Sequence, residues 1–428
     1  MGRLGGSWPF SVLIVFKPAV PITAQQGFRT RAIANGGRRN ACIWLGKWIV
    51  GCVMAGIPFV IDLATFNDWS GVRIIGSTYY ETSGSSVASA GDINGDGFAD
   101  VIVGAPGAAL SLYTDYAATV VFGRGIEDTP ADSVIDTGSL NSSEGFRIIL
   151  GGGYNGPEGG FAVSSAGDFN GDGFDDVMVS APSSSSVGAE EKGATYIVFG
   201  KAGGFTDVTL GAATSSNWIR IDGAAADDYS GRSVAALGDI NGDGYGDVLI
   251  GSPGSDANGW SSGVSYVVYG NASGANIDLA SFGASDGFRI IGEEFGSAGQ
   301  SVSAAGDVNG DGHIDYIIGA PYNDVNGLHF VGSTYVVFGG NGGVDIDLAN
   351  LTPSQGIRID GNGEGQNESG HSVSSAGDIN GDGLADLIIG APEADPAGRQ
   401  GAGSAYVIFG KTNGWSNIDL ANLAAGDG

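Results

Sequence analysis

Five short acidic loops of identical spacing contain the residues of this chain that could do chemistry. In the first loop, DINGDGFAD, positions 1, 3, 5 and 9 are Asp92, Asn94, Asp96 and Asp100. Side chains at alternate positions of a tight loop can direct their oxygens to one centre, and the intervening glycines permit the positive φ angles that this requires. With the carbonyl of Phe98 at position 7, the loop offers an all-oxygen ligand set. Such a set suits Ca²⁺ better than Mg²⁺ or a transition metal.

The same loop occurs four more times along the chain. A plain Asx–Gly turn would explain one copy, but five copies with fixed acidic positions favour cation binding. We therefore predict about five Ca²⁺ ions that act as structural clamps and not in catalysis. The predicted ligands in the other four loops, with position 7 again contributing its carbonyl, are Asp168, Asn170, Asp172, Phe174 and Asp176; Asp239, Asn241, Asp243, Tyr245 and Asp247; Asp307, Asn309, Asp311, His313 and Asp315; and Asp378, Asn380, Asp382, Leu384 and Asp386.

Each acidic loop lies within a repeat of about seventy residues. A run of small residues such as SVASAG precedes the loop, and an apolar run ending in a turn, such as VIVGAP, follows it. Then come a β-branched run ending in an aromatic residue and glycine, such as TVVFG, and a short run with one arginine. These runs indicate four strands per repeat. The repeat predicts an all-β fold, a β-propeller of four-stranded blades; a β-solenoid is the alternative, although its repeats are usually shorter.

The two ends of the repeat series predict how the propeller closes. Residues 71–76, GVRIIG, match a fourth strand with no blade before them, and the sequence stops where the next fourth strand would begin. The simplest closure places residues 71–76 beside the strand within 401–410, which gives five blades and hides an edge strand. The alternative is a fragment of a longer propeller, for example a seven-bladed one.

Charge divides the chain into two regions. The 428 residues include 18 Lys and Arg against 47 Asp and Glu, for a net charge of −29. This balance lacks the basic surface that nucleic acid requires, so we expect no nucleic-acid partner. No acidic residue occurs before Asp62, and both cysteines lie in the same early segment. We therefore predict a basic and apolar segment over residues 1–60 and the propeller over residues 61–428.

The apolar run over residues 41–61 has one charged residue, Lys47. It is long enough to cross a bilayer, and the arginines before it would hold the N-terminus in the cytoplasm. One interpretation of this segment is therefore a signal anchor or possible membrane anchor. The alternatives are an extension that does not belong to the native fold and an additional soluble element.

The order SVxxAGD, DxNGDGxxD, GAP and YVVFG resembles the FG-GAP repeat of the integrin α-chain N-terminal propeller and its bacterial relatives. The resemblance covers about residues 61–428. It implies a β-propeller with Ca²⁺ in the loops between first and second strands on the lower face, and a cell-surface adhesion or recognition role with ligands on the upper face. Integrin propellers have seven blades, whereas five copies are visible here.

Two further sets of residues are candidates for specific contacts. Arginines in the fourth strand of each repeat suggest structural pairing with an acidic neighbour: Arg73, Arg147, Arg220, Arg289 and Arg358. Aromatic residues in the upper-face connections are candidate ligand contacts, although several could simply pack the loops: Tyr79, Tyr80, Tyr154, Tyr229, Trp260, Phe295 and Tyr322.

We therefore predict a calcium-stabilised module for adhesion or recognition, located outside the cell or on its surface, that binds an extracellular protein or glycan. No catalytic residue is identified, and we expect no enzyme activity. The alternatives are a lectin-like carbohydrate-binding propeller and an accessory propeller of a secreted hydrolase such as a phospholipase.

Overall fold

The computed structural model divides the chain into two units, Met1–Ser70 and Gly71–Gly428. Residues 54–71 are not described, so the predicted boundary near residue 60 stays a prediction. The structure describes residues 29–35, 38–45, 48–53, 72–79, 81–107, 116–125, 134–150, 160–183, 192–211, 215–363, 366–423, 426 and 428.

In the first unit, the structure has three antiparallel strands, β1 (Arg29–Asn35), β2 (Arg38–Leu45) and β3 (Trp48–Val53). Within the possible membrane segment over residues 41–61, residues 41–45 and 48–53 lie in strands, and the other residues fall outside the described part. A bilayer-crossing helix would need an unbroken helical run, which these strands do not provide.

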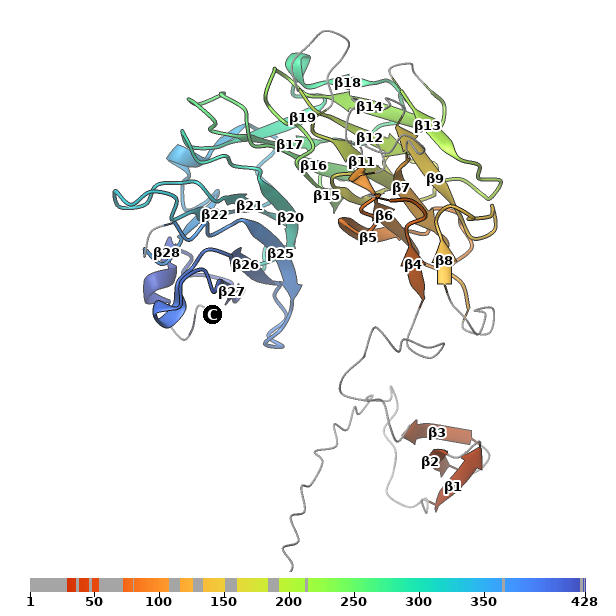
Figure 1. Ribbon diagram of the computed structural model, residues 1–428. Coiled ribbons are helices and arrows are strands. Elements are labelled where there is room, and N and C mark those ends of the chain that lie inside the picture. Colours follow the sequence, from red (N-terminus) through yellow and green to blue (C-terminus); the bar gives the residue numbers. More distant parts are fainter. Residues whose placement is uncertain are drawn as a thin grey trace, which may run out of the picture. The chain divides into compact units, whose positions relative to one another are not determined.

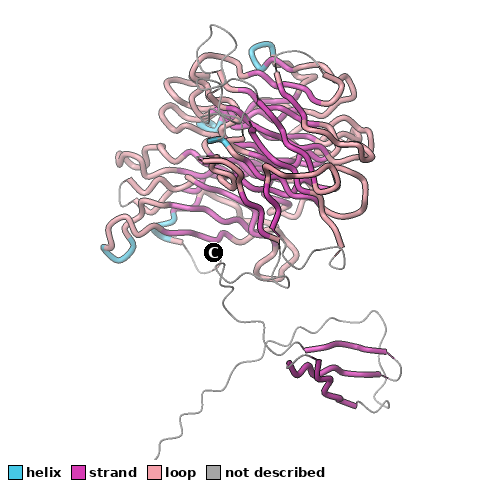
Figure 2. The backbone as a smooth tube through the Cα atoms, turned by 45° about the vertical axis from the view of Figure 1, so that its right-hand side comes forward, coloured by secondary structure: helices cyan, strands magenta, loops and turns pink. Residues whose placement is uncertain are grey.

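The second unit consists of successive antiparallel sheets, which we call blades (Figures 1 and 2). The all-β prediction is confirmed, and helical segments in the described part are three-residue 3₁₀ turns such as η5 (Leu279–Ser281). The blade strands are β5 (Ser86–Gly91), β6 (Asp100–Gly104), β7 (Tyr116–Val121) and β9 (Gly145–Leu150) in blade one; β10 (Val163–Gly167), β11 (Asp176–Ala181), β12 (Ala194–Val198) and β14 (Trp218–Asp222) in blade two; β15 (Ser233–Gly238), β16 (Asp247–Ser252), β17 (Val264–Val268) and β19 (Gly287–Ile291) in blade three; β20 (Ser301–Gly306), β21 (Asp315–Ala320), β22 (Ser333–Val337) and β24 (Gly356–Asp360) in blade four; and β25 (Ser372–Gly377), β26 (Asp386–Ala391) and β27 (Ser404–Ile408) in blade five.

The blades follow one another in sequence order with their first strands side by side. β5 contacts β10, and the contacts continue through β15 and β20 to β25. The hydrophobic core lies between neighbouring blades; for example, one cluster joins Leu249 and Phe288 of blade three to Tyr316 and Ile318 of blade four. Second strands are therefore covered on both faces, and every residue of β11, β16 and β21 is buried. These features are those of a β-propeller.

A fifth, parallel strand covers the outer edge of most blades, and the sequence did not predict it. It comes from the connection between the third and fourth strands of the following repeat, so each repeat overlaps the one before it. Three of these strands end in an aspartate whose carboxylate caps a 3₁₀ turn, as Asp347 does by accepting from the Ala349 amide at 3.0 Å. The pairs are β8 (Val134–Asp136) on β4 (Arg73–Ile75), β13 (Val208–Leu210) on β9, β18 (Ile277–Asp278) on β14, β23 (Ile346–Asp347) on β19, and β28 (Ile418–Asp419) on β24.

The predicted five-bladed closure is not present. β4, which corresponds to residues 71–76, pairs with β8, whereas β27 belongs to a separate three-stranded sheet with β25 and β26. The expected strand pairing between residues 71–76 and 401–410 is therefore wrong for this structure. The sequence match identified β4 correctly as a fourth strand, but strand type does not determine which third strand it joins.

Two glycine positions of the motif have a structural explanation: one after the third strand, and one at the end of the second strand, where the second repeat has Ser180 instead. The glycine after the third strand lies against the backbone of the acidic loop: a Cβ on Gly200 would meet the Asp175 carbonyl at 2.3 Å. The glycine at the end of the second strand admits the backbone of the next blade, since a Cβ on Gly319 would meet the Gly370 carbonyl at 1.9 Å. At Gly200 and Gly319 a side chain would require the backbone to move, because the nearest obstacle is backbone.

Candidate metal-binding loops and the opposite face

All five acidic loops join the first strand of a blade to its second strand, as predicted. Because strand direction alternates within a blade, these loops share a face with the connections between third and fourth strands. Neighbouring loops also contact one another through the backbone. The Gly246 amide donates to the Asp168 carbonyl at 2.7 Å, and the Ala385 amide donates to the Asp307 carbonyl at 3.0 Å.

The side chains at positions 1, 3 and 5 organise each loop from within. In the first loop, the two carboxylate oxygens of Asp92 accept from the amides of Asp96 and Gly97 at 3.0 and 2.9 Å. Asn94 also accepts from the Asp96 amide, at 2.8 Å, and its own amide group donates to the Asp96 carboxylate. The same bonds recur in the other four loops, so positions 1, 3 and 5 converge on one another in every copy.

The carboxylate at position 9 has a different environment, because it is buried and bonded to backbone amides at two sites. Asp176 is fully buried, accepts from the Phe169 amide at 2.9 Å and accepts from the Gly200 amide at 2.8 Å. It therefore ties the start of the loop to the end of the third strand. Burial raises the pKa of Asp176 to about 8, with repulsion from Asp172 and Asp168 adding to the increase.

Within the described residues, no group of three or more Asp, Glu, His or Cys side chains is arranged to hold a metal. In each loop one of the four predicted side-chain ligands is an asparagine, and the position-9 carboxylate is engaged by amides. The donor set nevertheless fits a hard cation. It contains only oxygens, it is held by a preformed loop, and its carboxylates repel one another in the absence of a positive charge.

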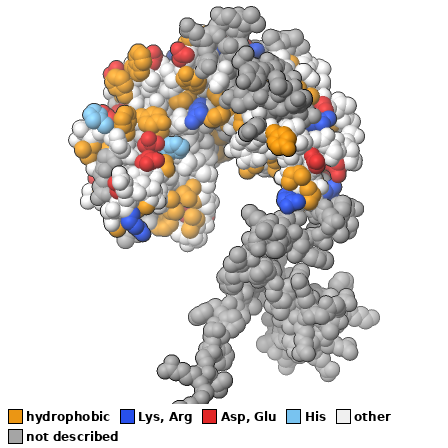
Figure 3. Space-filling model, in the orientation of Figure 1, with side chains coloured by type: hydrophobic (Ala, Val, Ile, Leu, Met, Phe, Trp, Pro, Cys, Tyr) orange, Lys and Arg blue, Asp and Glu red, His pale blue; other side chains and the backbone are white. Residues whose placement is uncertain are grey.

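The predicted ligand-contact aromatics lie on the opposite face, in the connections between second and third strands and between fourth and first strands. Tyr79, Trp260 and Phe295 are well exposed, with 91%, 69% and 57% of their surface accessible, Tyr229 is 38% exposed, and Tyr322 is half-buried against Phe330. The structure brings part of the set together, because the Phe295 amide donates to the Trp260 carbonyl at 2.8 Å. Tyr80 and Tyr154 lie outside the described residues. Figure 3 shows exposed hydrophobic side chains lying among acidic ones on one side of the molecule.

The repeated arginines pair with acidic residues in two alternative ways. Arg147 and Arg289 reach the residue before the parallel fifth strand, and their Nε atoms donate at 3.0 Å to Asp207 and Asp345. In the other two blades that position is an asparagine, which accepts only from the arginine's backbone amide, as Asn417 does.

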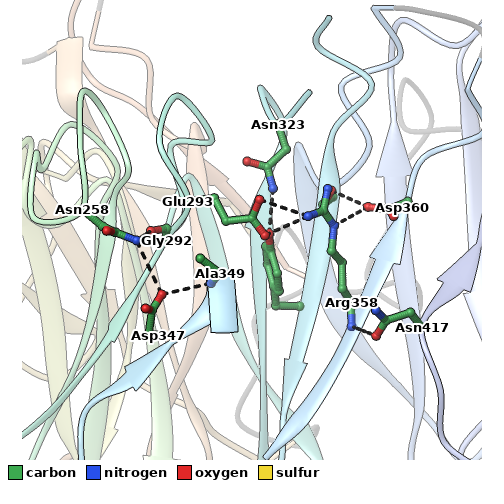
Figure 4. Close-up of polar contacts among 11 residues, drawn as sticks. Asn258, Gly292, Glu293, Asn323, Asp347, Ala349, Arg358, Asp360 and Asn417 are labelled. Carbon is green, nitrogen blue, oxygen red and sulfur yellow. Dashed lines mark hydrogen bonds and ion pairs between the residues drawn. The ribbon is translucent and has the colours of Figure 1, made fainter. Parts of the chain in front are cut away.

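Where the asparagine occurs, the arginine pairs with an aspartate on its own strand. Arg220 pairs with Asp222 at 2.6 Å, and Arg358 pairs with Asp360 at 2.5 Å. The predicted structural pairing is confirmed for these four arginines, whereas Arg73 makes no ion pair with any residue that the structure describes. Arg358 in addition donates from Nη1 to Glu293 at 2.8 Å (Figure 4).

We expect Arg358→Met to lower the free energy of unfolding by about 3 kcal/mol, because Glu293 and Asp360 would keep partly buried charges without a partner. The matched control is Arg289→Met, whose ion pair with Asp345 is about 40% exposed on both sides and should cost about 1 kcal/mol or less. Urea unfolding of both variants measures the difference. Equal losses of unfolding free energy in the two variants would show that the ion pairs around Arg358 stabilise the fold no more than the exposed pair of Arg289 does.

Comparison with known proteins agrees with this geometry. The FG-GAP repeat model matches residues 83–121, 159–198, 230–268 and 369–408, each spanning the first three strands of a blade with the acidic loop between the first two. The chain is an FG-GAP repeat protein. Blade four lies between matched repeats and has the same strands and the same loop, so the FG-GAP architecture extends through it.

The relatives of this FG-GAP protein include two classes of larger protein. It is 28% identical to integrin alpha pat-2 of Caenorhabditis elegans over 53% of this chain and 17% of that protein. It is 34% identical to integrin alpha-PS2 of Drosophila melanogaster over 44% of this chain and 12% of that protein. It is also 36% identical to phosphatidylinositol-glycan-specific phospholipase D of Bos taurus, over 38% of this chain and 18% of that enzyme. The chain thus spans a fifth or less of these proteins.

The described residues of the FG-GAP protein contain no helix with the length and apolar composition that a membrane crossing requires.

Proposed function

We propose that this FG-GAP protein is an extracellular or cell-surface recognition module, in which the acidic loops bind Ca²⁺ and the opposite face binds a protein or glycan. The observation that carries the proposal is the separation of these two features. The ligand-like loops are near-identical in all five blades, whereas the connections on the other face differ from blade to blade and expose aromatic residues. Uniform loops suit a structural role, and variable loops on a rigid scaffold suit recognition.

The ligands in each loop would be the side chains at positions 1, 3, 5 and 9 and the carbonyl at position 7. A bound Ca²⁺ supplies positive charge to a loop whose carboxylates otherwise repel one another. The loop amides hold the carboxylates of positions 1 and 5 in place. The protein therefore needs little reordering of these side chains to accept an ion.

The proposal is tested by binding of the biotinylated full chain to immobilised fibronectin, laminin and collagen and to a glycan array, in millimolar Ca²⁺ and in EDTA. We expect saturable binding to at least one surface in Ca²⁺ and weaker binding in EDTA. Failure to bind any of these surfaces would count against a role in recognition.

The phospholipase relatives favour a second candidate, an accessory propeller of a secreted hydrolase. Under that candidate the chain itself has no catalytic activity. Incubation with a glycosylphosphatidylinositol-anchored protein and with phosphatidylcholine vesicles, followed by assay of released headgroup, tests this point. Hydrolysis that is lost on substitution of a residue on the loop face would overturn the non-enzymatic proposal.

A further inference from the structure

A pocket of about 550 Å³ lies on the aromatic face where blades two and three meet. One wall comes from the connection that joins β14 to β15, and the other comes from the loop that joins β16 to β17. Its lining includes two of the predicted ligand-contact aromatics, Tyr229 and Trp260, together with Asp228 and Tyr266. The question is why a pocket exists here.

The equivalent place in the next two blades is filled by a polar side chain. In blade four the hydroxyl of Tyr335, in the middle of the third strand, donates to Glu293 Oε1 at 2.7 Å (Figure 4). In blade five Asn362 makes the corresponding contact, and its amide group donates to the Tyr406 hydroxyl at 3.2 Å. Glu293 and Asn362 hold the same position, directly after a glycine that ends a fourth strand and whose amide donates at 2.9 Å to the glycine before the third strand of the same blade.

In blade three that position is Ala224, which follows Gly223 with the same 2.9 Å amide bond. A methyl group cannot reach the tyrosine of the third strand, Tyr266, which is only 4% exposed. Tyr266 occupies the same register as Tyr335, opposite the arginine of the fourth strand. Among the described residues its hydroxyl has no hydrogen-bond partner, so a donor and acceptor group faces the pocket unused.

Asp228 supplies the complementary group. Its side chain is 3% exposed, and Oδ2 accepts from the Ala225 amide at 2.8 Å, whereas Oδ1 has no donor among the described residues. Burial raises the pKa of Asp228 to about 6, repulsion from Asp256 and Asp227 adds to this, and Lys192 opposes it. Oδ1 is therefore free to accept a hydrogen bond from a hydroxyl group of a ligand in the pocket.

We propose that this pocket binds one saccharide unit of a glycan. Sugar hydroxyls both donate and accept, so one ring can accept from Tyr266 and donate to Asp228, while the exposed indole of Trp260 offers a face for the apolar side of the ring. A cationic group could pair with Asp228, but it has no acceptor for the Tyr266 proton, and it would approach the Arg289 guanidinium that also lines the pocket. The proposal rests on the recognition function above and specifies one of its ligands.

Saturation-transfer difference NMR on the full chain in millimolar Ca²⁺ tests the proposal, with D-glucose, D-galactose, D-mannose, N-acetyl-D-glucosamine and L-fucose as probes. Trp260→Ala should weaken binding of the preferred sugar by about tenfold. Ala224→Glu should abolish binding while remaining folded, because the new carboxylate would copy the contact of Glu293 with Tyr335. Val344→Ala is the control: it removes an exposed apolar side chain in the connection between β22 and β23, on the opposite face and outside the pocket lining, and should leave the affinity unchanged.

Three outcomes would overturn the proposal. The first is no saturable binding of any of the five sugars. The second is sugar binding that Ala224→Glu and Trp260→Ala leave unchanged, which would place the sugar elsewhere. The third is binding of Nα-acetyl-arginine amide that Asp228→Asn removes, with no sugar bound, which would identify a cation pocket. If the Ala224→Glu protein still binds its matrix surface, the recognition function stands and the saccharide pocket alone fails.

Discussion

Millimolar Ca²⁺ is expected to raise the thermal midpoint of the full chain by about 10 °C or more above its value in EDTA. An ion that binds only the folded state adds about 2.7 kcal/mol per site at a hundredfold excess over Kd. Five such sites would add on the order of 10 kcal/mol, and each kcal/mol moves the midpoint of a large domain by about 2 °C. The physical source is relief of repulsion. At Asp100, Asp176, Asp247 and Asp315, burial raises the pKa of the position-9 carboxyl, and repulsion from the other loop carboxylates raises it further.

Scanning calorimetry in EDTA, in Ca²⁺ and in equimolar Mg²⁺ measures this effect, and titration calorimetry counts the ions. We expect a smaller rise with Mg²⁺, because these loops lack the strict octahedral geometry that Mg²⁺ requires. A midpoint that is the same in Ca²⁺ and EDTA would mean that the loops are turns held by their own amides. The proposed role of the ions would then fail, although the fold would be unaffected.

Asp176→Ala is expected to lower the free energy of unfolding by about 3 kcal/mol or more even in EDTA. The substitution leaves the Gly200 amide buried without an acceptor, which costs about 1–3 kcal/mol. It also removes one of the two acceptors of the Phe169 amide, which would keep only the Gly167 carbonyl at 3.1 Å. It also releases the loop from the end of the third strand. The gain from Ca²⁺ at this loop should disappear in the same variant.

Asp172→Asn separates the two roles of the loop. Asp172 occupies position 5, is exposed, and accepts from the Phe174 amide at 3.1 Å, a bond that asparagine can retain. We expect this variant to match the parent protein in EDTA and to lose about one fifth of the increase in Ca²⁺. If Asp176→Ala and Asp172→Asn were equally stable in EDTA, position 9 would not be the structural clasp that its hydrogen bonds indicate.

Much of the blade architecture follows from the sequence because backbone geometry dictates the motif letters. The glycine after the third strand leaves room for the acidic loop, since a Cβ on Gly200 would meet the Asp175 carbonyl at 2.3 Å, and its amide donates to the position-9 carboxylate of Asp176 at 2.8 Å. Because the motif occurs five times at similar spacing, it can be recognised in the sequence. The strands, the acidic loops and the arginine pairs were predictable for this reason.

The parallel fifth strands were missed because they are two or three residues long, which is too short to show the alternation of apolar and polar residues that is typical of a strand. A signal was present: the sequence Ile-Asp-Leu-Ala begins at Ile277, Ile346 and Ile418. Its repetition reflects a strand end whose aspartate caps a 3₁₀ turn. Ring closure could not be predicted, because it depends on tertiary contacts between the two ends of the series.

The pocket could not be predicted for another reason. It arises from a missing side chain at Ala224, and only the structures of the next two blades show what that position normally holds. Sequence reasoning selected Tyr229 and Trp260 for their type and loop position. It had no means to connect them with Tyr266 or with the buried carboxylate of Asp228.

Because each repeat supplies an edge strand to the blade before it, the blades are completed in the order of their synthesis. During synthesis the earlier blade emerges first, with the outer edge of its fourth strand bare, and that edge stays bare until the next repeat is more than half made. β9 must wait for β13, and β19 must wait for β23. Bare edges invite pairing with other chains, so the growing chain carries one such edge at a time, always at its youngest complete blade. Each new repeat therefore covers the outer edge of the preceding blade before its own fourth strand has been made.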